Sequence, residues 1–127
     1  METKGKILVV DDEKSMCEIL RNYLEEDGYT VTEAYNGNDA LEIARKEKFS
    51  LIILDVALPA MDGYMIARAL RDEEKTFMTP VIMISAKRKE YKDKLAGFIS
   101  GACDYLAKPF KKEDLLNSVH KILSIQQ

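Results

Sequence analysis

The stretch Leu51-Ile52-Ile53-Leu54-Asp55 decides the fold, because it is an unbroken apolar run that ends in a carboxylate. The segment 56–63, which contains Pro59 and the dipeptide Asp62-Gly63, follows it directly. A short run of branched side chains closed by turn residues is typical of a parallel strand buried on both faces. Asp55 would then lie at the carboxyl end of that strand, where open α/β sheets bind ligands. At this point Asp55 is either a reactive group or a carboxylate that caps a loop.

Four similar strands and five helices are expected around this run. Helical spacing of apolar residues predicts helices from Met16 to Gly28, around residues 40–47 and 66–70, from Lys87 to Gly101, and from Leu115 to about Gln127. The remaining strands are expected at residues 7–10, 29–34, 80–85 and 104–107. Alternating strands and helices with short connections predict a doubly wound, five-stranded parallel sheet of order 2-1-3-4-5, which is a flavodoxin-like α/β fold.

Length and composition limit the alternatives. The chain has 127 residues, which is the size of one domain, so we expect residues 1–127 to form a single unit. A net charge of -3 gives no electrostatic case for nucleic acid binding, and no segment has the length of a membrane helix. Cys17 and Cys103 lack the spacing of a disulfide framework or zinc site, so we expect two small apolar packing residues in a cytoplasmic protein.

The strand ends carry complementary chemical groups. In the predicted topology Asp11, Asp12 and Asp55 meet in one cleft, which Ser85 and Lys108 close from the fourth and fifth strands. Clustered carboxylates repel each other unless a cation joins them, and oxygen ligands with room for phosphate favour magnesium. Asp55 would then attack phosphorus while Lys108 neutralises charge. Taken singly, the acids at 11 and 12 are equally well explained as helix caps, Ser85 as a turn cap and Lys108 as a solvated side chain.

The full set of motifs resembles the receiver domain of two-component response regulators. The resemblance rests on Asp11-Asp12, on Asp55 with Leu58-Pro59 and Met61-Asp62-Gly63, on Ser85-Ala86, and on Asp104-Tyr105 to Lys108-Pro109-Phe110. It implies a signalling switch that catalyses only its own phosphorylation and dephosphorylation. Asp55 would accept a phosphoryl group, with magnesium, from a histidine kinase, a histidine phosphotransfer protein or a small phosphodonor.

The resemblance also implies roles for the other residues of the cleft. Asp12, Asp55 and the Ala57 carbonyl would ligate the metal directly, and Asp11 would act through water. Ser85 and Tyr105 resemble the switch pair, although Tyr105 also fits a packing role alone, and Lys108 would contact the phosphoryl group. The surface formed by the predicted helix 87–101, the strand 104–107 and the final helix would change on phosphorylation, and it would bind a downstream protein or a second copy.

The resemblance also implies that two positions tune the lifetime of the phosphoryl group, Ala57 and Lys87, which lie two residues beyond Asp55 and Ser85. Ala57 has no side chain that positions a hydrolytic water, which predicts slow dephosphorylation, whereas the sign of the Lys87 effect stays open. Two rival functions remain. A phosphatase or phosphotransferase with an aspartyl-phosphate expects an acid where Ala57 stands, and a flavodoxin-like nucleotide or flavin binder expects a phosphate-binding loop where Asp11-Asp12-Glu13 stands.

Overall fold

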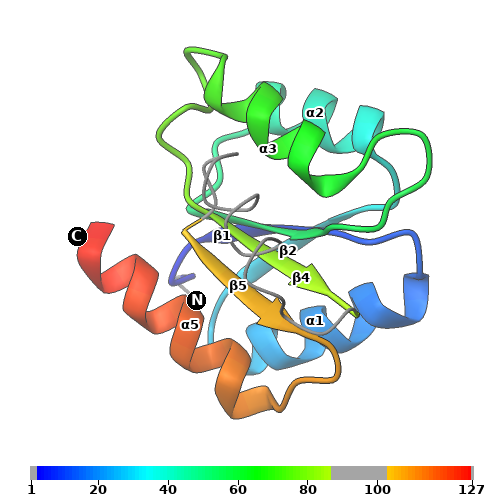
Figure 1. Ribbon diagram of the computed structural model, residues 1–127. Helices are drawn as coiled ribbons and strands as arrows, with labels where there is room; N and C mark the ends of the chain where they lie inside the picture. Colours follow the sequence, from blue (N-terminus) through cyan, green and yellow to red (C-terminus); the bar gives the residue numbers. More distant parts are fainter. Residues whose placement is uncertain (1–2, 87–102, 127) are drawn as a thin grey trace.

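Five parallel strands form one sheet in the order β2-β1-β3-β4-β5 (Figure 1). The structure is a computed structural model that describes residues 3–86 and 103–126. The predicted helix 87–101, and with it Lys87, lies outside the described residues. The elements follow one another as β1 (Lys6–Val10), α1 (Lys14–Glu26), β2 (Thr30–Ala34), α2 (Gly37–Lys46), β3 (Leu51–Asp55), α3 (Gly63–Arg71), β4 (Val81–Ser85), β5 (Asp104–Ala107) and α5 (Lys112–Gln126).

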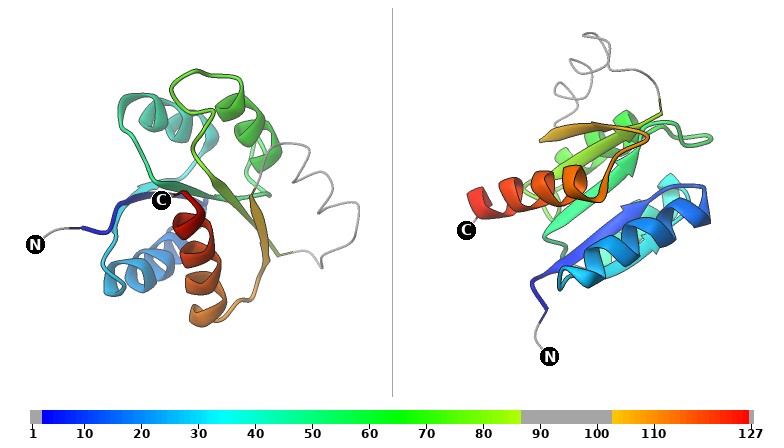
Figure 2. Two further views of the ribbon diagram at one scale, coloured as in Figure 1. Left: turned by 90° about the vertical axis from the view of Figure 1, so that its left-hand side faces the viewer. Right: turned by 90° about the horizontal axis from the view of Figure 1, so that it is seen from below.

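The sheet separates two hydrophobic cores. Helices α2 and α3 cover one face, and α1 and α5 cover the other (Figures 1 and 2). Alternate residues of each strand point to opposite faces, so Ile52 and Leu54 pack toward α2 and α3 while Leu51 and Ile53 pack toward α1 and α5. All five residues of β3 are buried, which confirms the prediction that an unbroken apolar run forms a strand covered on both sides.

The register brings the strand ends together. Val10 pairs with Leu54, Asp55 with Ile84, and Ser85 with Ala107, so the residues that follow these positions leave the sheet at one edge. Backbone hydrogen bonds extend the sheet by one more step, because Val56 N donates to Ile84 O at 2.8 Å and Lys108 N donates to Ser85 O at 2.7 Å. The sheet therefore fixes the backbone positions of Asp55, Ser85 and Lys108 at this edge.

Element boundaries differ from the predictions by a few residues. Helix α1 begins at Lys14, two positions before the first apolar residue of its stripe, because Glu13 O accepts hydrogen bonds from Met16 N and Cys17 N and so closes the first turn. Helix α3 ends at Arg71, so the charged residues 72–75 that follow it belong to turns. The prediction for the thiols is confirmed for Cys17, which is buried, and is wrong for Cys103, which is exposed.

No helix among the described residues is long and apolar enough to cross a bilayer.

Candidate functional site

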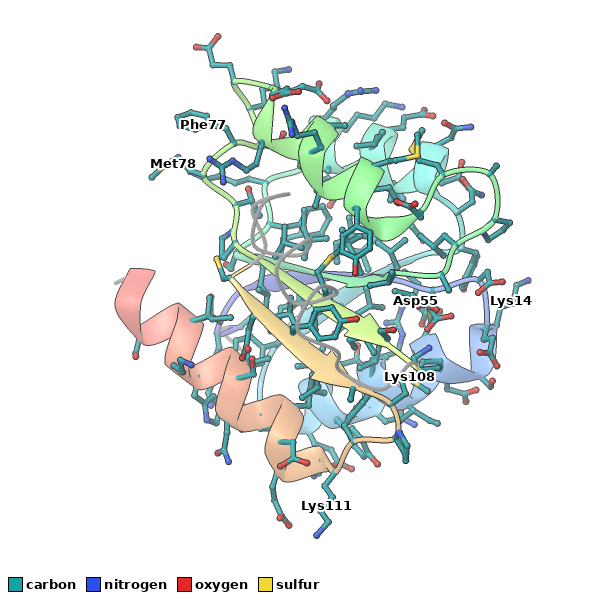
Figure 3. All side chains as sticks on the ribbon, viewed as in Figure 1. Lys14, Asp55, Phe77, Met78, Lys108 and Lys111 are labelled. Atoms are coloured by element: carbon teal, nitrogen blue, oxygen red, sulfur yellow. The ribbon has the colours of Figure 1, made fainter. Side chains whose placement is uncertain are left out.

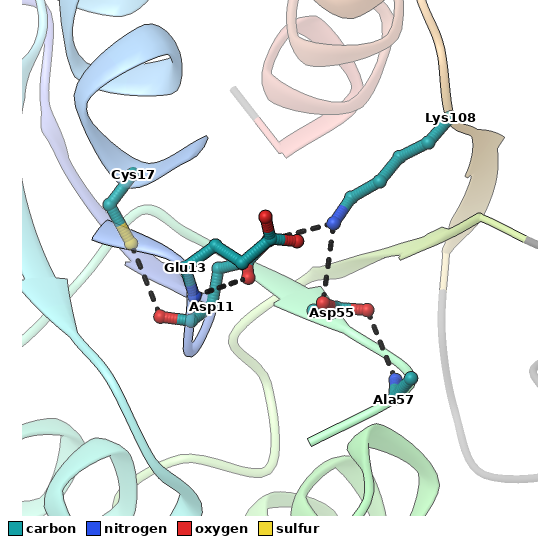
Figure 4. A network of polar contacts seen from close by, with 6 residues as sticks. All are labelled: Asp11, Glu13, Cys17, Asp55, Ala57 and Lys108. Carbon is teal, nitrogen blue, oxygen red and sulfur yellow. Dashed lines mark hydrogen bonds and ion pairs between the residues drawn. The ribbon is translucent and has the colours of Figure 1, made fainter. Parts of the chain in front are cut away.

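Asp55 ends β3 and is almost fully buried, with 6% of its surface exposed. Its two carboxylate oxygens have different partners (Figure 4). Oδ1 accepts a hydrogen bond from Ala57 N at 3.0 Å, and Oδ2 lies 3.2 Å from Lys108 Nζ. Asp55 therefore does more than cap the loop that follows it, because a cation from another strand end reaches the same carboxylate.

Lys108 joins two carboxylates that are distant in the sequence. Its Nζ donates to Asp11 Oδ2 at 2.9 Å as well as to Asp55, and only 12% of its side chain is exposed (Figure 4). Burial alone would lower the pKa of Lys108, but the hydrogen bond from the ammonium to Asp11 and the charges of Asp11 and Asp55 outweigh it and raise the pKa. The interpretation of Lys108 as a solvated side chain is therefore wrong, and the ammonium stays charged in the cleft.

Asp11 follows β1 and is 1% exposed. Its Oδ1 accepts from Glu13 N at 2.9 Å, so it also forms the turn that leads into α1, and its backbone carbonyl accepts from Cys17 Sγ at 3.5 Å. Burial raises the pKa of Asp11, and the nearby charge of Asp55 adds to this rise, against the opposing effects of the Glu13 amide and Lys108. Asp11 thus shapes the turn before α1 and contacts Lys108, but it does not cap the helix, because the N-cap residue is Glu13 and no side chain caps it.

Asp12 completes a group of three carboxylates. Unlike the other two acids it is exposed, and one ligand oxygen from each of Asp11, Asp12 and Asp55 lies within 4.8 Å of the others. Hard oxygen donors at this spacing suit a small divalent cation such as Mg²⁺, and one Lys108 ammonium cannot balance three negative charges. The donor set and the excess of negative charge both fit a metal ion at this place.

Ser85 and Tyr105 lie on the neighbouring strands β4 and β5. Both are buried, Ser85 with 3% and Tyr105 with 4% of its surface exposed. Tyr105 belongs to the core under α2 and α3, so the packing role that its sequence position allowed is present. Ala57 is exposed next to Asp55, while Lys87 lies outside the described residues.

The loop from β3 to α3 contains a positioning residue that sequence reasoning treated only as part of a turn. Gly63 N donates to Val56 O at 2.9 Å, and a Cβ built on Gly63 would lie 2.7 Å from Asp55 O and 2.9 Å from Val56 Cα. Only glycine lets α3 begin this close to the backbone at the end of β3. Asp62 caps the same helix by accepting from Met65 N at 2.9 Å, and Ala60 turns the loop with a φ of 66°. The signal in the sequence was the dipeptide Asp62-Gly63.

Comparison with known proteins places this geometry in context. Residues 7–120 match the family described as response regulator receiver domain. The transcriptional regulatory protein SrrA of Staphylococcus aureus is 40% identical over 119 residues, which cover 94% of this chain and 48% of SrrA. The chain therefore spans about half the length of this curated relative.

Solved structures agree with the family match. The chemotaxis response regulator CheY4 of Vibrio cholerae aligns with a TM-score of 0.89 and 34% identity, over 94% of this chain and 99% of that one. The receiver domain of the sensor histidine kinase PA1611 from Pseudomonas aeruginosa aligns with a TM-score of 0.86 and 30% identity, over 94% of this chain and 98% of that one. That domain was solved with a magnesium ion coordinated in its active-site cleft.

Proposed function

Since this chain belongs to the family of response regulator receiver domains, and so is a phosphorylation-activated signalling switch, we propose that Asp55 is the residue that accepts its phosphoryl group. The observation that carries this proposal is the Lys108 ammonium shared between Asp11 and Asp55, at 2.9 and 3.2 Å. The buried carboxylate of Asp55 can supply a nucleophilic oxygen. The ammonium of Lys108 beside it can balance the negative charge of the incoming phosphoryl group. The family match also decides against the phosphatase and the nucleotide-binder alternatives.

The transfer follows from these contacts. One carboxylate oxygen of Asp55 forms a bond to phosphorus while the bond from phosphorus to the donor, a phosphohistidine nitrogen or an acyl phosphate oxygen, breaks and leaves its electron pair on the donor. Lys108 stays protonated and balances charge on the phosphoryl oxygens, and the Ala57 amide supplies a neutral donor beside Asp55. The protein catalyses this change only on itself.

We assign the metal to the same edge of the sheet. Asp11, Asp12, Asp55 and the backbone carbonyl of Ala57 would hold Mg²⁺, with Asp11 acting through water. When bound, this ion supplies further positive charge to the phosphoryl oxygens. The three-carboxylate group supports this assignment, because its negative charge exceeds what Lys108 balances.

The response is proposed to travel through Ser85, Tyr105 and Lys108. The Ser85 hydroxyl would bind the new phosphoryl group, and the Tyr105 ring and Lys108 would carry the change to β5 and its neighbours. Ala57 and Lys87 are proposed to tune how long the phosphoryl group persists. All of residues 1–127 are assigned to this one receiver domain.

The proposed partners follow from the same chemistry. The donor is a sensor histidine kinase or a histidine phosphotransfer protein in the cytoplasm. A downstream protein, or a second copy of this chain, would bind the surface of the predicted helix 87–101, β5 and α5.

The nucleophile assignment is tested with acetyl phosphate and MgCl₂, using intact-mass spectrometry to detect the gain of one phosphoryl group. We expect wild type and the control Asp72→Asn, whose carboxylate is exposed on the surface, to gain the group equally. Asp55→Asn should gain none. Labelling of Asp55→Asn at the wild-type level would show that another residue is the acceptor.

A further inference from the structure

A groove with a volume of about 850 Å³ lies at the end of the sheet where the strands begin. Its lining includes residues one or two positions before four strands: Lys4 before β1, Tyr29 before β2, Ser50 before β3 and Pro80 before β4. Because all strands are parallel, this end is opposite the edge that carries Asp55. We call it the basal groove. Occupation of the basal groove leaves the phosphoryl site open.

The basal groove carries an excess of positive charge. Among the residues that the structure describes, its lining contains the lysines Lys4, Lys48 and Lys75 and a single acid, Glu74. Lys4 lies 3.7 Å from Asp27, whereas Lys48 and Lys75 have no carboxylate within 4.0 Å among the residues that the structure describes. The whole chain has a net charge of -3, so this local group of lysines is opposite in sign to the net charge of the molecule. Two ammonium groups are thus available to an anionic partner.

Two exposed apolar side chains belong to the loop that borders the groove. Met78, which lines it, is 70% exposed, and the adjacent Phe77 is 53% exposed. Figure 3 shows both at the opposite end of the molecule from Asp55 and Lys108. Large apolar side chains grouped on the surface beside a groove are typical of sites that bind other molecules.

The loop that presents these two side chains is held in place by its own contacts. Buried Thr76 donates from Oγ1 to Leu70 O at 2.6 Å, and Phe77 N donates to Glu73 O at 2.9 Å. Arg45 of α2 binds both carboxylate oxygens of Glu73, at 2.7 and 2.9 Å. Phe77 and Met78 therefore stand on a braced loop, so a partner that covers them does not have to order it.

We propose that the basal groove binds an acidic segment of a partner protein that carries a bulky apolar residue. Its carboxylates would meet Lys48 and Lys75, and its apolar side chain would cover Met78 and Phe77. A second copy of this chain is a poorer occupant, because a two-fold contact through this surface places lysines against lysines. A flat anionic membrane is a poorer one because the lysines line a concave groove.

The test measures the fluorescence anisotropy of a short labelled peptide with a central Phe-Leu pair flanked by glutamates. One control peptide has lysine in place of each glutamate, and another has serine in place of Phe-Leu. We expect saturable binding of the first peptide only. Lys48→Glu/Lys75→Glu should weaken that binding at least about fivefold, since each exposed ion pair contributes a modest amount that salt screens. Phe77→Ser/Met78→Ser should weaken it to a similar extent.

The matched control is Lys14→Glu/Lys111→Glu, which makes the same charge change at the phosphoryl end, where Figure 3 shows both lysines. This control should bind the acidic peptide as wild type does. If the control and the groove variant lose affinity for the acidic peptide equally, the binding is general charge attraction and the proposal is wrong. Binding of the serine peptide as tightly as the Phe-Leu peptide would overturn it as well. Sedimentation that reveals a dimer dissociated by Phe77→Ser/Met78→Ser would assign the groove to a second copy and overturn the proposal. Binding to anionic vesicles that Lys48→Glu/Lys75→Glu abolishes, without saturable binding of the acidic peptide, would assign it to a membrane surface and also overturn the proposal.

Discussion

Asp11 has two functions whose energetic effects oppose each other. It is buried and forms the turn into α1, yet it lies beside Asp55, whose charge adds to the rise that burial causes in the pKa of Asp11. A carboxyl whose pKa is higher in the folded than in the unfolded protein destabilises the fold once it is ionised. The ionised carboxylate of Asp11 thus lowers the stability of the fold, and its presence there is explained by the metal-binding role proposed for it.

Asp11→Asn should therefore stabilise the protein in EDTA at pH 7 by about 1 kcal/mol, since the amide keeps an oxygen for Glu13 N and loses the charge. The advantage over wild type should be small below the unfolded carboxyl pKa of about 3.9 and grow as pH rises through the higher folded pKa of Asp11. Urea unfolding at several pH values measures this. The exposed control Asp72→Asn should change stability by less than about 0.5 kcal/mol. A destabilised Asp11→Asn protein at pH 7 would mean that the bond to Lys108 outweighs the burial of the charge.

Ala57 is an exposed residue two positions after Asp55, the proposed phosphoryl acceptor, and its amide donates a hydrogen bond to the Asp55 carboxylate. Ala57→Asn should fit there without displacing a neighbour, and its carboxamide should orient water toward the phosphoryl group and shorten the phosphoryl lifetime severalfold. Decay of radiolabelled phosphoprotein gives the rate. Ala57→Val has added bulk without a polar group and should not accelerate decay. An unchanged rate in Ala57→Asn, or equal rates in the two variants, contradicts the water-positioning explanation.

At the scale of elements, the start of α3 rests directly on the end of β3 through Gly63. In an open helix start, Gly→Ala would stabilise by up to about 1 kcal/mol. Here the added Cβ meets backbone rather than a movable side chain, so Gly63→Ala should destabilise by about 1–3 kcal/mol. It should also slow phosphorylation by acetyl phosphate, because the backbone of Asp55 has to shift. Thermal unfolding and the rate of labelling measure the two effects, and a stabilised variant would show that the approach of α3 is looser than described.

The elements and their ends were largely predictable, whereas the contacts between them were not. Apolar periodicity marks buried positions, so it located β3 and the stripe of α1, but it missed Lys14 at the start of α1 because that turn is made by the backbone of Glu13. The convergence of Asp11, Asp55 and Lys108 followed from topology. The position of the Lys108 ammonium between the two acids depends on side-chain packing, and the spacing of residues in the sequence does not predict such packing. The error for Cys103 has the same origin, since the burial of a thiol depends on its neighbours.

Over the whole molecule, the three-carboxylate group should couple stability to magnesium. A cation that binds only the folded state adds free energy according to its concentration, so saturating MgCl₂ should stabilise wild type by at least about 1 kcal/mol, or roughly 4 °C in Tm, relative to EDTA. Asp12→Asn should lose most of this increase while Asp72→Asn keeps it. Differential scanning calorimetry in both buffers provides the comparison. Equal shifts in wild type and Asp12→Asn would place the ion elsewhere.

The strand order also predicts that β3 and β5 differ in how often their backbone hydrogen bonds open. Asp55 ends β3, which is hydrogen-bonded to β1 on one side and β4 on the other, whereas Tyr105 and Lys108 lie on or just after β5, for which β4 is the hydrogen-bonded neighbour. Backbone amides of strands bonded on both sides open rarely, and those of strands bonded on one side open more often. Amide hydrogen exchange should therefore be slowest in β3 and measurably faster in β5. On this expectation Asp55, the proposed acceptor, lies on a strand that rarely opens, and the residues assigned to signalling lie on or just after a strand that is freer to rearrange.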